Sequence, residues 1–266
     1  MECRVTTFSR SSCDVSIVIP AYNEESRLGP TLDRILDFVR RQQWAAELIV
    51  VDGCSQDGTA GLVRRYSHSH SNVRLLQLVS NRGKGYCVRE GVMSANGRVI
   101  LFTDADLSSP IEESLLLLAA LESGADVAIG SRWMRRELQS RRQSLSRQGL
   151  GRLFNFMLRL TLGLDYTDTQ CGFKAFRRSA AETIFPLQRI ERWGFDPEIL
   201  FLAGQAGLKV AEVPVRWAHD DRSRINPVAD GVRMAIEVLA VRWYSLNGKY
   251  SDRTNLGSPF GLSAFG

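Results

Sequence analysis

Two carboxylates separated by one small residue stand directly after a strongly apolar run. The run is 99–103 (VILFT), and Asp104-Ala105-Asp106 follows it. If the run is a strand, both acids lie just beyond its carboxyl end, and in extended backbone their side chains point to the same side. Two anionic oxygen ligands directed at one point suit Mg²⁺ or Mn²⁺, above all when substrate phosphates complete the coordination shell. The structural alternative is a solvated loop in which Asp104 caps the backbone.

Two other apolar runs end in polar loops that could share this site. The run 14–20 leads into the loop 20–24 (PAYNE), and the run 47–51 leads into a loop at 52–59 that begins with an aspartate. The carboxyl ends of parallel strands meet at one edge of an open α/β sheet, and ligands bind at that edge. We therefore expect the three loops to form one site.

A lysine between two glycines is a further candidate for binding an anion. Lys84 lies in 81–85 (NRGKG), where a helix is expected to begin. Its side chain can reach a phosphate while the glycines let the backbone approach closely, and a plain helix-start loop is the alternative. Asp57 is equally open, because an aspartate at a helix start either caps the helix or contacts a ligand.

Apolar runs and helical patterns alternate along the chain, with short loops between them. The expected strands are 14–20, 47–51, 73–78, 99–103, 126–129 and 209–217. The expected helices are 28–39, 59–67, 85–97, 111–123, the second half of 190–201, and 232–244. This strict alternation predicts an α/β protein with a parallel, doubly wound sheet.

Composition predicts a single domain without a membrane span. The 266 residues are 44% hydrophobic and 24% charged, as in ordinary globular proteins. No uncharged stretch approaches the roughly 18–20 apolar residues that cross a bilayer. We expect residues 1–13 to be a flexible leader without the apolar core of a secretory signal, 14–245 to be one domain, and 246–266 to be a flexible tail.

Charge and cysteine usage narrow the partners and the compartment. The net charge is +5 and the pI is near 9.1, which favours anionic partners. Nucleic-acid binding would account for the arginine-rich stretch 132–152 but leaves the acidic loops without a purpose, so no nucleic-acid partner is expected. The five cysteines are scattered without a C-x-x-C pair, which argues for a reducing cytoplasm and against a zinc site.

The motifs, taken together, resemble one enzyme family. The set I-V-I-P-A-Y-N-E, V-V-D-G-x-S-x-D-G-T, N-x-G-K-G and D-A-D-L is similar to the nucleotide-sugar half of a family 2 glycosyltransferase. The blocks D-T-Q-C-G-F-K and I-E-R-W-x-F-D-x-E resemble the dolichyl-phosphate β-glucosyltransferase branch, which is akin to the dolichyl-phosphate mannose synthases. The resemblance implies a GT-A fold, a Rossmann-like domain with a mixed, mostly parallel sheet flanked by helices. Its donor half would be 14–131 and its acceptor half 132–245.

The reaction that the resemblance implies is an inverting, metal-dependent transfer of a hexose, with glucose favoured, from a UDP-sugar to a polyprenyl or dolichyl phosphate. GDP-mannose as donor remains an alternative. So does a soluble enzyme with a hydroxyl acceptor, which would need Asp168 or Asp196 as base. A sugar nucleotidyltransferase is disfavoured because no glycine-rich signature follows the first strand. A processive synthase is rejected, although 189–193 matches R-x-x-R-W, because membrane helices and a T-E-D motif are missing.

The resemblance also assigns roles to individual residues. The donor and its Mg²⁺ or Mn²⁺ would be bound by Pro20, Ala21, Tyr22, Glu24, Asp52, Asp57, Lys84, Asp104, Ala105 and Asp106, with Asp104 and Asp106 as the metal ligands. The sugar and the acceptor phosphate would contact Arg132, Arg147, Gln170, Trp193, Glu198, Arg222 and Arg224. Catalysis would rest on Asp104, Asp106, Arg132, Arg147 and Asp168.

The arginines in that set suit the acceptor because a guanidinium binds phosphate oxygens in pairs. Asp168 would order these arginines or approach the sugar, and a core position is the alternative for Trp193. We expect peripheral contact with the cytoplasmic face of a membrane through 153–164 and 232–243, although both stretches could equally be core helices.

Overall fold

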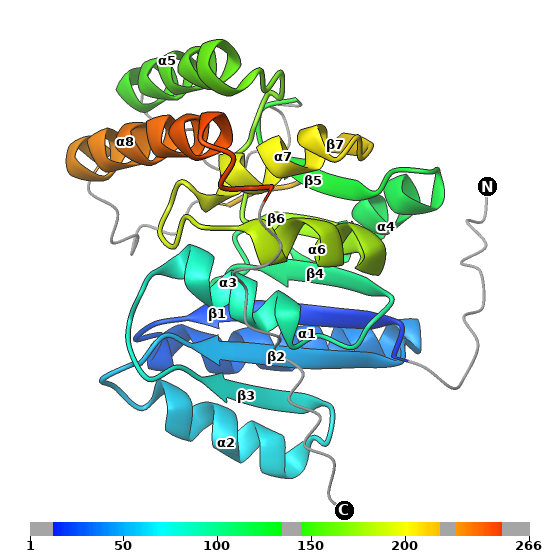
Figure 1. Cartoon of the computed structure of the whole chain (residues 1–266). Coiled ribbons are helices and arrows are strands. Elements are labelled where there is room, and N and C mark those ends of the chain that lie inside the picture. The colour runs from blue at the N-terminus through cyan, green and yellow to red at the C-terminus, as the bar shows by residue number, and fades with distance from the viewer. Residues whose placement is uncertain (1–12, 135–144, 219–226, 252–266) are drawn as a thin grey trace, which may run out of the picture.

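A computed structural model of the chain describes residues 13–134, 145–218 and 227–251 (Figure 1). Its strands are β1 (Val15–Ala21), β2 (Ala46–Asp52), β3 (Val73–Gln77), β4 (Val99–Thr103), β5 (Val127–Ser131), β6 (Phe173–Arg177) and β7 (Val210–Pro214). Its helices are α1 (Glu25–Gln42), α2 (Thr59–Ser69), α3 (Lys84–Met93), α4 (Ser114–Glu122), α5 (Leu145–Leu162), α6 (Arg178–Ile184), α7 (Phe195–Gln205) and α8 (Pro227–Leu246), with short 3₁₀ turns η1 (Ile111–Glu113) and η3 (Phe185–Leu187).

The strands form one mixed sheet in the order β3-β2-β1-β4-β6-β5-β7. β1 pairs in parallel with β2 and β4, β2 with β3, and β5 with β7. β6 runs antiparallel between β4 and β5. The mixed sheet of the GT-A fold is confirmed, whereas the wholly parallel sheet predicted from alternation alone is wrong at β6.

β6 has no counterpart among the predicted strands. A lysine stands in the middle of its short sequence FKAFR, and a charged residue there conceals the signature of a buried strand. Lys174 is nevertheless fully buried, because its ammonium forms an ion pair with Asp196 at the start of α7. An interaction between residues far apart in sequence therefore permits this strand.

Helices cover both faces of the sheet (Figure 1). On one face, α1 buries Leu28, Leu32, Ile35 and Val39, the apolar positions that helical spacing predicted. Each such side chain contributes roughly 1.5–3 kcal/mol when it leaves water. The other face packs against apolar residues of α3, α6, α7 and α8. Two hydrophobic layers thus hold the sheet rigid beneath the loops at its edge.

The carboxyl-terminal boundary lies later than predicted. Tyr250 is 7% exposed, and its hydroxyl donates a hydrogen bond to Glu198 in α7. Tyr250 therefore anchors the end of this segment to the domain, and 252–266 lie outside the described residues, as does most of the predicted leader. Within the described part of the chain, no helix is both long and apolar enough to span a bilayer.

Candidate active site

Three loops gather at the carboxyl edge of β1, β2 and β4, as the sequence predicted. The strand register places Ala21 beside Asp52 and Val18 beside Phe102, so the three strands end close together. Hydrogen bonds join the first two loops directly. The Asn23 N–H donates to the Ser55 hydroxyl at 2.8 Å, and the Glu24 N–H donates to Thr59 Oγ1 at 2.8 Å. These bonds fix one rigid wall of the site.

Asp104 and Asp106 lie in a turn, not in the extended backbone that the sequence argument assumed. β4 ends at Thr103, and the Leu107 N–H donates to the Asp104 carbonyl at 3.1 Å. Asp106 Oδ1 accepts the Ser108 N–H at 2.9 Å, while Ala105 is buried. Asp104 pairs directly with the Lys84 ammonium, and the charge of Asp106 also helps to raise the pKa of Lys84.

Lys84 stands opposite this turn, at the first residue of α3. Its ammonium lies 2.5 Å from Asp104 Oδ1 and 5.6 Å from the centre of the Trp193 ring. Burial disfavours the charged ammonium, but Asp104 and other carboxylates raise the pKa of Lys84 above its ordinary value. Gly83 precedes it with φ of 121°, where a side chain would also collide with the Glu191 carbonyl. The lysine is therefore charged and aimed at the acidic turn.

The donor set fits a divalent cation only in partnership with a ligand. Among the described residues no group of three or more His, Cys, Asp or Glu side chains could hold a metal. Two partly exposed carboxylates, Asp104 and Asp106, are available, and Mg²⁺ characteristically takes one or two carboxylates while substrate phosphates and water supply its other ligands. The residues fit a cation that arrives with a diphosphate.

The predicted nucleoside contacts divide into exposed and enclosed residues. Tyr22 is 39% exposed and offers an aromatic face, whereas Ala21 is buried and Pro20 is half-buried. Glu24 is engaged in an ion pair with Arg27 at 2.5 Å. Asp52 is fully buried, and its oxygens accept hydrogen bonds from Ser55 N–H and Gln77 Nε2.

Asp57 lies at the start of α2 and stabilises the loop there. It accepts the N–H of Thr59 at 3.0 Å and the N–H of Glu25 at 3.3 Å. Burial alone would raise its pKa, but these hydrogen bonds hold the pKa of Asp57 below its ordinary value. The sequence left both capping and ligand contact open for Asp57, and these hydrogen bonds show the structural role.

Arg132 and Asp168 form the centre of the predicted acceptor half, called the acceptor side below. Arg132 follows β5, and its Nε and Nη2 reach the two oxygens of Asp168 at 2.6 and 2.8 Å, while its N–H adds a third bond at 3.0 Å. Asp168 is 2% exposed, and burial alone would raise its pKa, but the guanidinium holds the pKa of Asp168 below its ordinary value. Of the two roles considered for Asp168, ordering an arginine fits this geometry.

The acceptor side also approaches the acidic turn that carries Asp104 and Asp106. A side chain at Gly172 would lie 2.2 Å from Asp104 Oδ2, so the segment before β6 passes directly against the acidic turn. Three buried polar atoms around this segment have no hydrogen-bond partner among the described residues: Ser131 Oγ, Thr169 Oγ1 and Gln170 Nε2. Buried polar atoms usually have a partner, so these three mark space for water or a ligand. Ser131 and Thr169 were not predicted as site residues. Their only sequence signal is that they lie directly beside the predicted residues Arg132, Asp168 and Gln170.

The remaining predicted residues fall into three groups. Trp193 is half-buried beside Lys84, so it forms a wall of the site and not part of the core. Glu198 is fully buried and accepts the N–H groups of Arg189 and Ile190, so the predicted contact with a sugar does not fit its position. The predicted arginines whose side chains lie outside the described part are Arg147, Arg222 and Arg224.

Sequence reasoning missed two supports of the site, one half-buried and one fully buried. Glu212 in β7 accepts the N–H groups of Thr167 and Asp168 at 2.9 and 2.7 Å. Lys174 donates to the Cys171 carbonyl at 2.7 Å as well as pairing with Asp196. No spacing rule connects these residues, because their partners come from distant segments.

The sheet, its acidic edge and the adjoining basic side define a glycosyltransferase of the GT-A type. A glucosyl-3-phosphoglycerate synthase of Mycobacterium tuberculosis, solved with Mn²⁺, UDP-glucose and phosphoglyceric acid, has this fold with a TM-score of 0.64 at 22% identity, over 95% of this chain and 84% of that one. Residues 16–185 match the model for glycosyl transferase family 2, and the chain belongs to that family.

Curated relatives share most of the chain. A dolichyl-phosphate beta-glucosyltransferase of Drosophila melanogaster is 37% identical over 86% of this chain and 74% of its own length. One from Trichomonas vaginalis is 33% identical over 96% of this chain and 78% of its own. The human protein of that name is 33% identical over 89% of this chain and 77% of its own. The similarity to that branch, predicted from the two sequence blocks, is confirmed.

Proposed function

We propose that this enzyme transfers glucose from UDP-glucose to dolichyl phosphate or a related polyprenyl phosphate with inversion at the anomeric carbon. One observation carries the choice of a phosphate acceptor: both carboxylates that could deprotonate a hydroxyl acceptor are already bound to cations. Asp168 is held by Arg132 and Asp196 by Lys174. A phosphate monoester is already anionic at neutral pH and needs no base. The names of the relatives support the same acceptor.

On the donor side, Asp104, Asp106 and Lys84 would bind the diphosphate. A bound Mg²⁺ or Mn²⁺ would supply electrostatic stabilisation of the leaving group. Lys84 pairs with Asp104 in the structure and would exchange this partner for the diphosphate when the donor binds. Tyr22 and Asp52 would complete the nucleoside site. An acceptor phosphate oxygen then forms a bond to the anomeric carbon as the bond from that carbon to UDP breaks. The electron pair of the broken bond leaves with the diphosphate.

On the acceptor side, Arg132 would position the attacking phosphate. The bidentate pair with Asp168 holds its guanidinium in one orientation. Trp217 adds a second constraint, because its ring centre lies 5.5 Å from the guanidinium carbon. Arg147, Arg222 and Arg224 remain proposed partners of the same phosphate.

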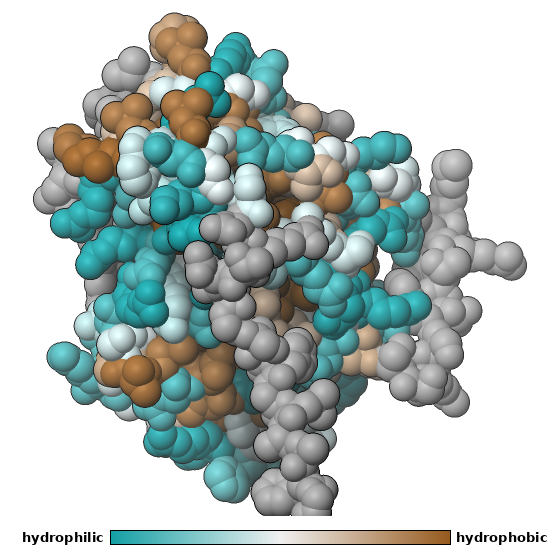
Figure 2. Space-filling view, viewed as in Figure 1, coloured by the Kyte–Doolittle hydropathy of each residue, from teal (hydrophilic) through white to brown (hydrophobic). Residues whose placement is uncertain are grey.

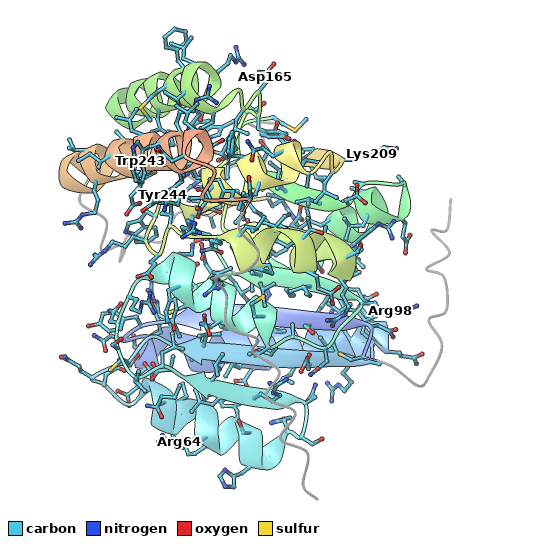
Figure 3. The ribbon with its side chains drawn as sticks, in the orientation of Figure 1. Arg64, Arg98, Asp165, Lys209, Trp243 and Tyr244 are labelled. Atoms are coloured by element: carbon cyan, nitrogen blue, oxygen red, sulfur yellow. The ribbon has the colours of Figure 1, made fainter. Side chains whose placement is uncertain are left out.

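A lipid acceptor also requires contact with a membrane, and one end of the molecule suits it. On α8 an exposed stripe of apolar residues is formed by Val232, Ile236, Leu239, Trp243 and Leu246, each more than half exposed. Phe156 and Leu160 extend the apolar surface on α5, which packs on α8. Figure 2 shows hydrophobic side chains gathered at this end, and Figure 3 labels Trp243 there. We propose that this end rests peripherally on the cytoplasmic face of the membrane.

The test is transfer of label from UDP-glucose or GDP-mannose to dolichyl phosphate, with dolichol as the matched acceptor that lacks the phosphate. With Mg²⁺ present, we expect glucose from UDP-glucose to enter the organic phase only with dolichyl phosphate. Chelation with EDTA should stop the reaction. Preference for GDP-mannose would overturn the donor, transfer to dolichol would overturn the acceptor, and full activity after EDTA would overturn the metal.

A further inference from the structure

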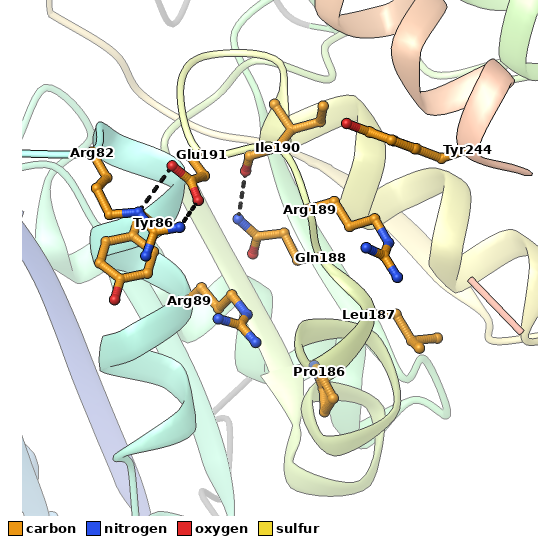
Figure 4. Close-up of a pocket in the computed structure, with 10 residues that line it drawn as sticks. All are labelled: Arg82, Tyr86, Arg89, Pro186, Leu187, Gln188, Arg189, Ile190, Glu191 and Tyr244. Atoms are coloured by element: carbon orange, nitrogen blue, oxygen red, sulfur yellow. Dashed lines mark hydrogen bonds and ion pairs between the residues drawn. The ribbon is translucent and has the colours of Figure 1, made fainter. Parts of the chain in front are cut away.

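A pocket lies on the flank of α3 (Figure 4). It is enclosed by α3, by the segment 186–191 and by Tyr244 of α8, and its volume is about 270 Å³. Because ligand pockets typically have volumes of about 300 Å³ or more, this pocket is near the lower limit and accommodates a small polar molecule. The donor and acceptor sites proposed above use none of its lining residues.

Positive charge dominates the lining of the pocket. Arg82, Arg89 and Arg189 face it, and Glu191 is the single carboxylate among the lining residues. Glu191 is already bound by Arg82 through Nε at 3.0 Å and through a second, shorter contact. Arg189 donates at 3.2 and 2.7 Å to the Lys249 carbonyl, a neutral partner. Arg89 pairs with Glu90 at 3.2 Å, and its Nε donates to the Phe185 carbonyl at 3.1 Å. The guanidinium of Arg189 therefore offers the pocket charge that an anion would neutralise, and Arg89 would share its charge between that anion and Glu90.

A buried acceptor in the same pocket calls for a hydrogen-bond donor. Gln188 is 5% exposed, and its Nε2 donates to the carbonyls of Gly85 and Ile190 at 2.9 Å each. Because both of these partners are acceptors, the orientation of the amide is fixed. Its Oε1 is left with no hydrogen-bond partner among the described residues. A buried amide oxygen without a donor is costly, so a hydroxyl group on a ligand fits this position.

We propose that this pocket binds a small phosphate monoester that carries hydroxyl groups. The phosphate would lie between the guanidiniums of Arg89 and Arg189, and a hydroxyl would donate to Gln188 Oε1. Arg82 stacks on Tyr86, with its guanidinium carbon 4.0 Å from the ring centre, and closes one side of the pocket. A free sugar phosphate and an inositol-phosphate lipid headgroup share this chemistry. This ligand is in addition to the proposed donor and acceptor.

The pocket shares a wall with the donor site, which gives a ligand there a route to the reaction. The Glu191 carbonyl accepts the N–H of Tyr86 at 2.9 Å, so the wall is attached to α3. Two residues further along the chain, Trp193 lies beside Lys84 on the donor side. A ligand that bridges α3 and 186–191 would order the segment that carries this tryptophan.

Calorimetric titration of the whole chain with glucose 6-phosphate tests the proposal, and glucose is the matched probe without the phosphate. We expect binding of glucose 6-phosphate, none of glucose, and a dissociation constant raised at least about tenfold in Arg189→Gln and in Arg89→Gln. Arg40→Gln, which removes an exposed arginine of α1 paired with Asp37, should bind as the unaltered protein does. Thermal melting verifies that each variant is folded.

Two further arms locate the site and the source of the ligand. Glucose 6-phosphate should still bind after saturation with UDP and Mg²⁺, because the donor site is separate. Phosphatidylcholine vesicles with and without phosphatidylinositol 4-phosphate test the headgroup, and a difference that Arg189→Gln abolishes would identify a lipid source. If neither probe binds, if UDP competes, or if folded Arg189→Gln and Arg89→Gln both bind normally, the proposal is overturned. None of these readouts requires transfer activity, so the proposed reaction can fail independently.

Discussion

The donor edge and the acceptor side of this enzyme are built in different ways. At the donor edge, carboxylates stand in turns directly after parallel strands, and neighbouring loops bind one another through hydrogen bonds from backbone N–H groups to hydroxyls. On the acceptor side, one arginine after β5 is fixed by an aspartate before β6, and that segment is fixed in turn by a glutamate in β7. The donor edge repeats one pattern, a strand followed by a polar turn, whereas the acceptor side depends on the pairing of charged side chains from separate segments.

The difference indicates how substitutions should act on each side of the site. A turn after a strand keeps its place as long as the strand is buried, so the donor residues are positioned by the core. The pair of Arg132 and Asp168 is positioned by three separate segments, and a change in any of them moves the guanidinium. We therefore expect substitutions at the donor edge to affect chemistry with little effect on folding. Changes on the acceptor side should alter acceptor use or stability.

The largest effect is expected for Asp106→Asn. The amide oxygen can still accept the Ser108 N–H, so the turn should persist while one anionic ligand is lost. We expect transfer to fall at least about 100-fold with an unchanged melting temperature. Asp37→Asn, on the exposed side of α1, is the control. Equal activity of the two variants would remove Asp106 from the site.

A pH-dependent change in stability is expected from Glu198. Burial raises its pKa to about 7 from an ordinary 4.5, so the folded protein binds the proton more tightly than the unfolded chain. The stability that protonation supplies is complete below about pH 4.5 and is lost as the pH rises through about 7. Between those limits, we expect the free energy of unfolding to fall by roughly 3 kcal/mol relative to Glu198→Gln. The free energy of unfolding would be measured with denaturant at each pH. The same pH dependence in the two proteins would contradict the raised pKa of Glu198.

Arg132→Lys tests the acceptor side with the charge preserved. Lysine cannot form the two parallel bonds to Asp168, so the cation loses its fixed orientation. We expect the KM for polyprenyl phosphate to rise about tenfold while the KM for UDP-glucose stays within about twofold. Arg159→Lys, an exposed residue of α5 paired with Asp165, is the matched control. A rise in the donor KM instead would erase the distinction between the two halves.

The smallest effect is expected at the apolar end. Replacing Trp243 and Leu246 together by serine should weaken binding to phosphatidylcholine vesicles about three- to fivefold in a flotation assay, since each side chain would be only partly inserted. Val79→Ser removes another exposed apolar side chain, which is 99% exposed, and should have no effect. Equal vesicle binding by all three proteins would argue against membrane contact through α8.

The same contrast explains what could be predicted from the sequence. The six predicted strands are present, and the three donor loops meet, because buried runs followed by polar turns are local signals. The strand β6 was not predictable from its own residues, since Lys174 is tolerated only through Asp196. Glu198 was misplaced for a related reason: its motif gave it a role, but its partners are backbone N–H groups of a preceding loop and a tyrosine 52 residues away.

The reversed direction of β6 has a further consequence. Its pairing of Phe173 with Thr103 brings the entrance to β6 level with the exit from β4. The rim is therefore shared by loops that leave strands and by one that enters a strand. Apart from Asp168, which holds Arg132, and Gly172, which lies against Asp104, the entering loop can be recoded without moving the point at which β4 stops. A single activating apparatus is thus compatible with different recipients, and exchange of residues 165–167 and 169–171 would be an economical route to redirect this enzyme.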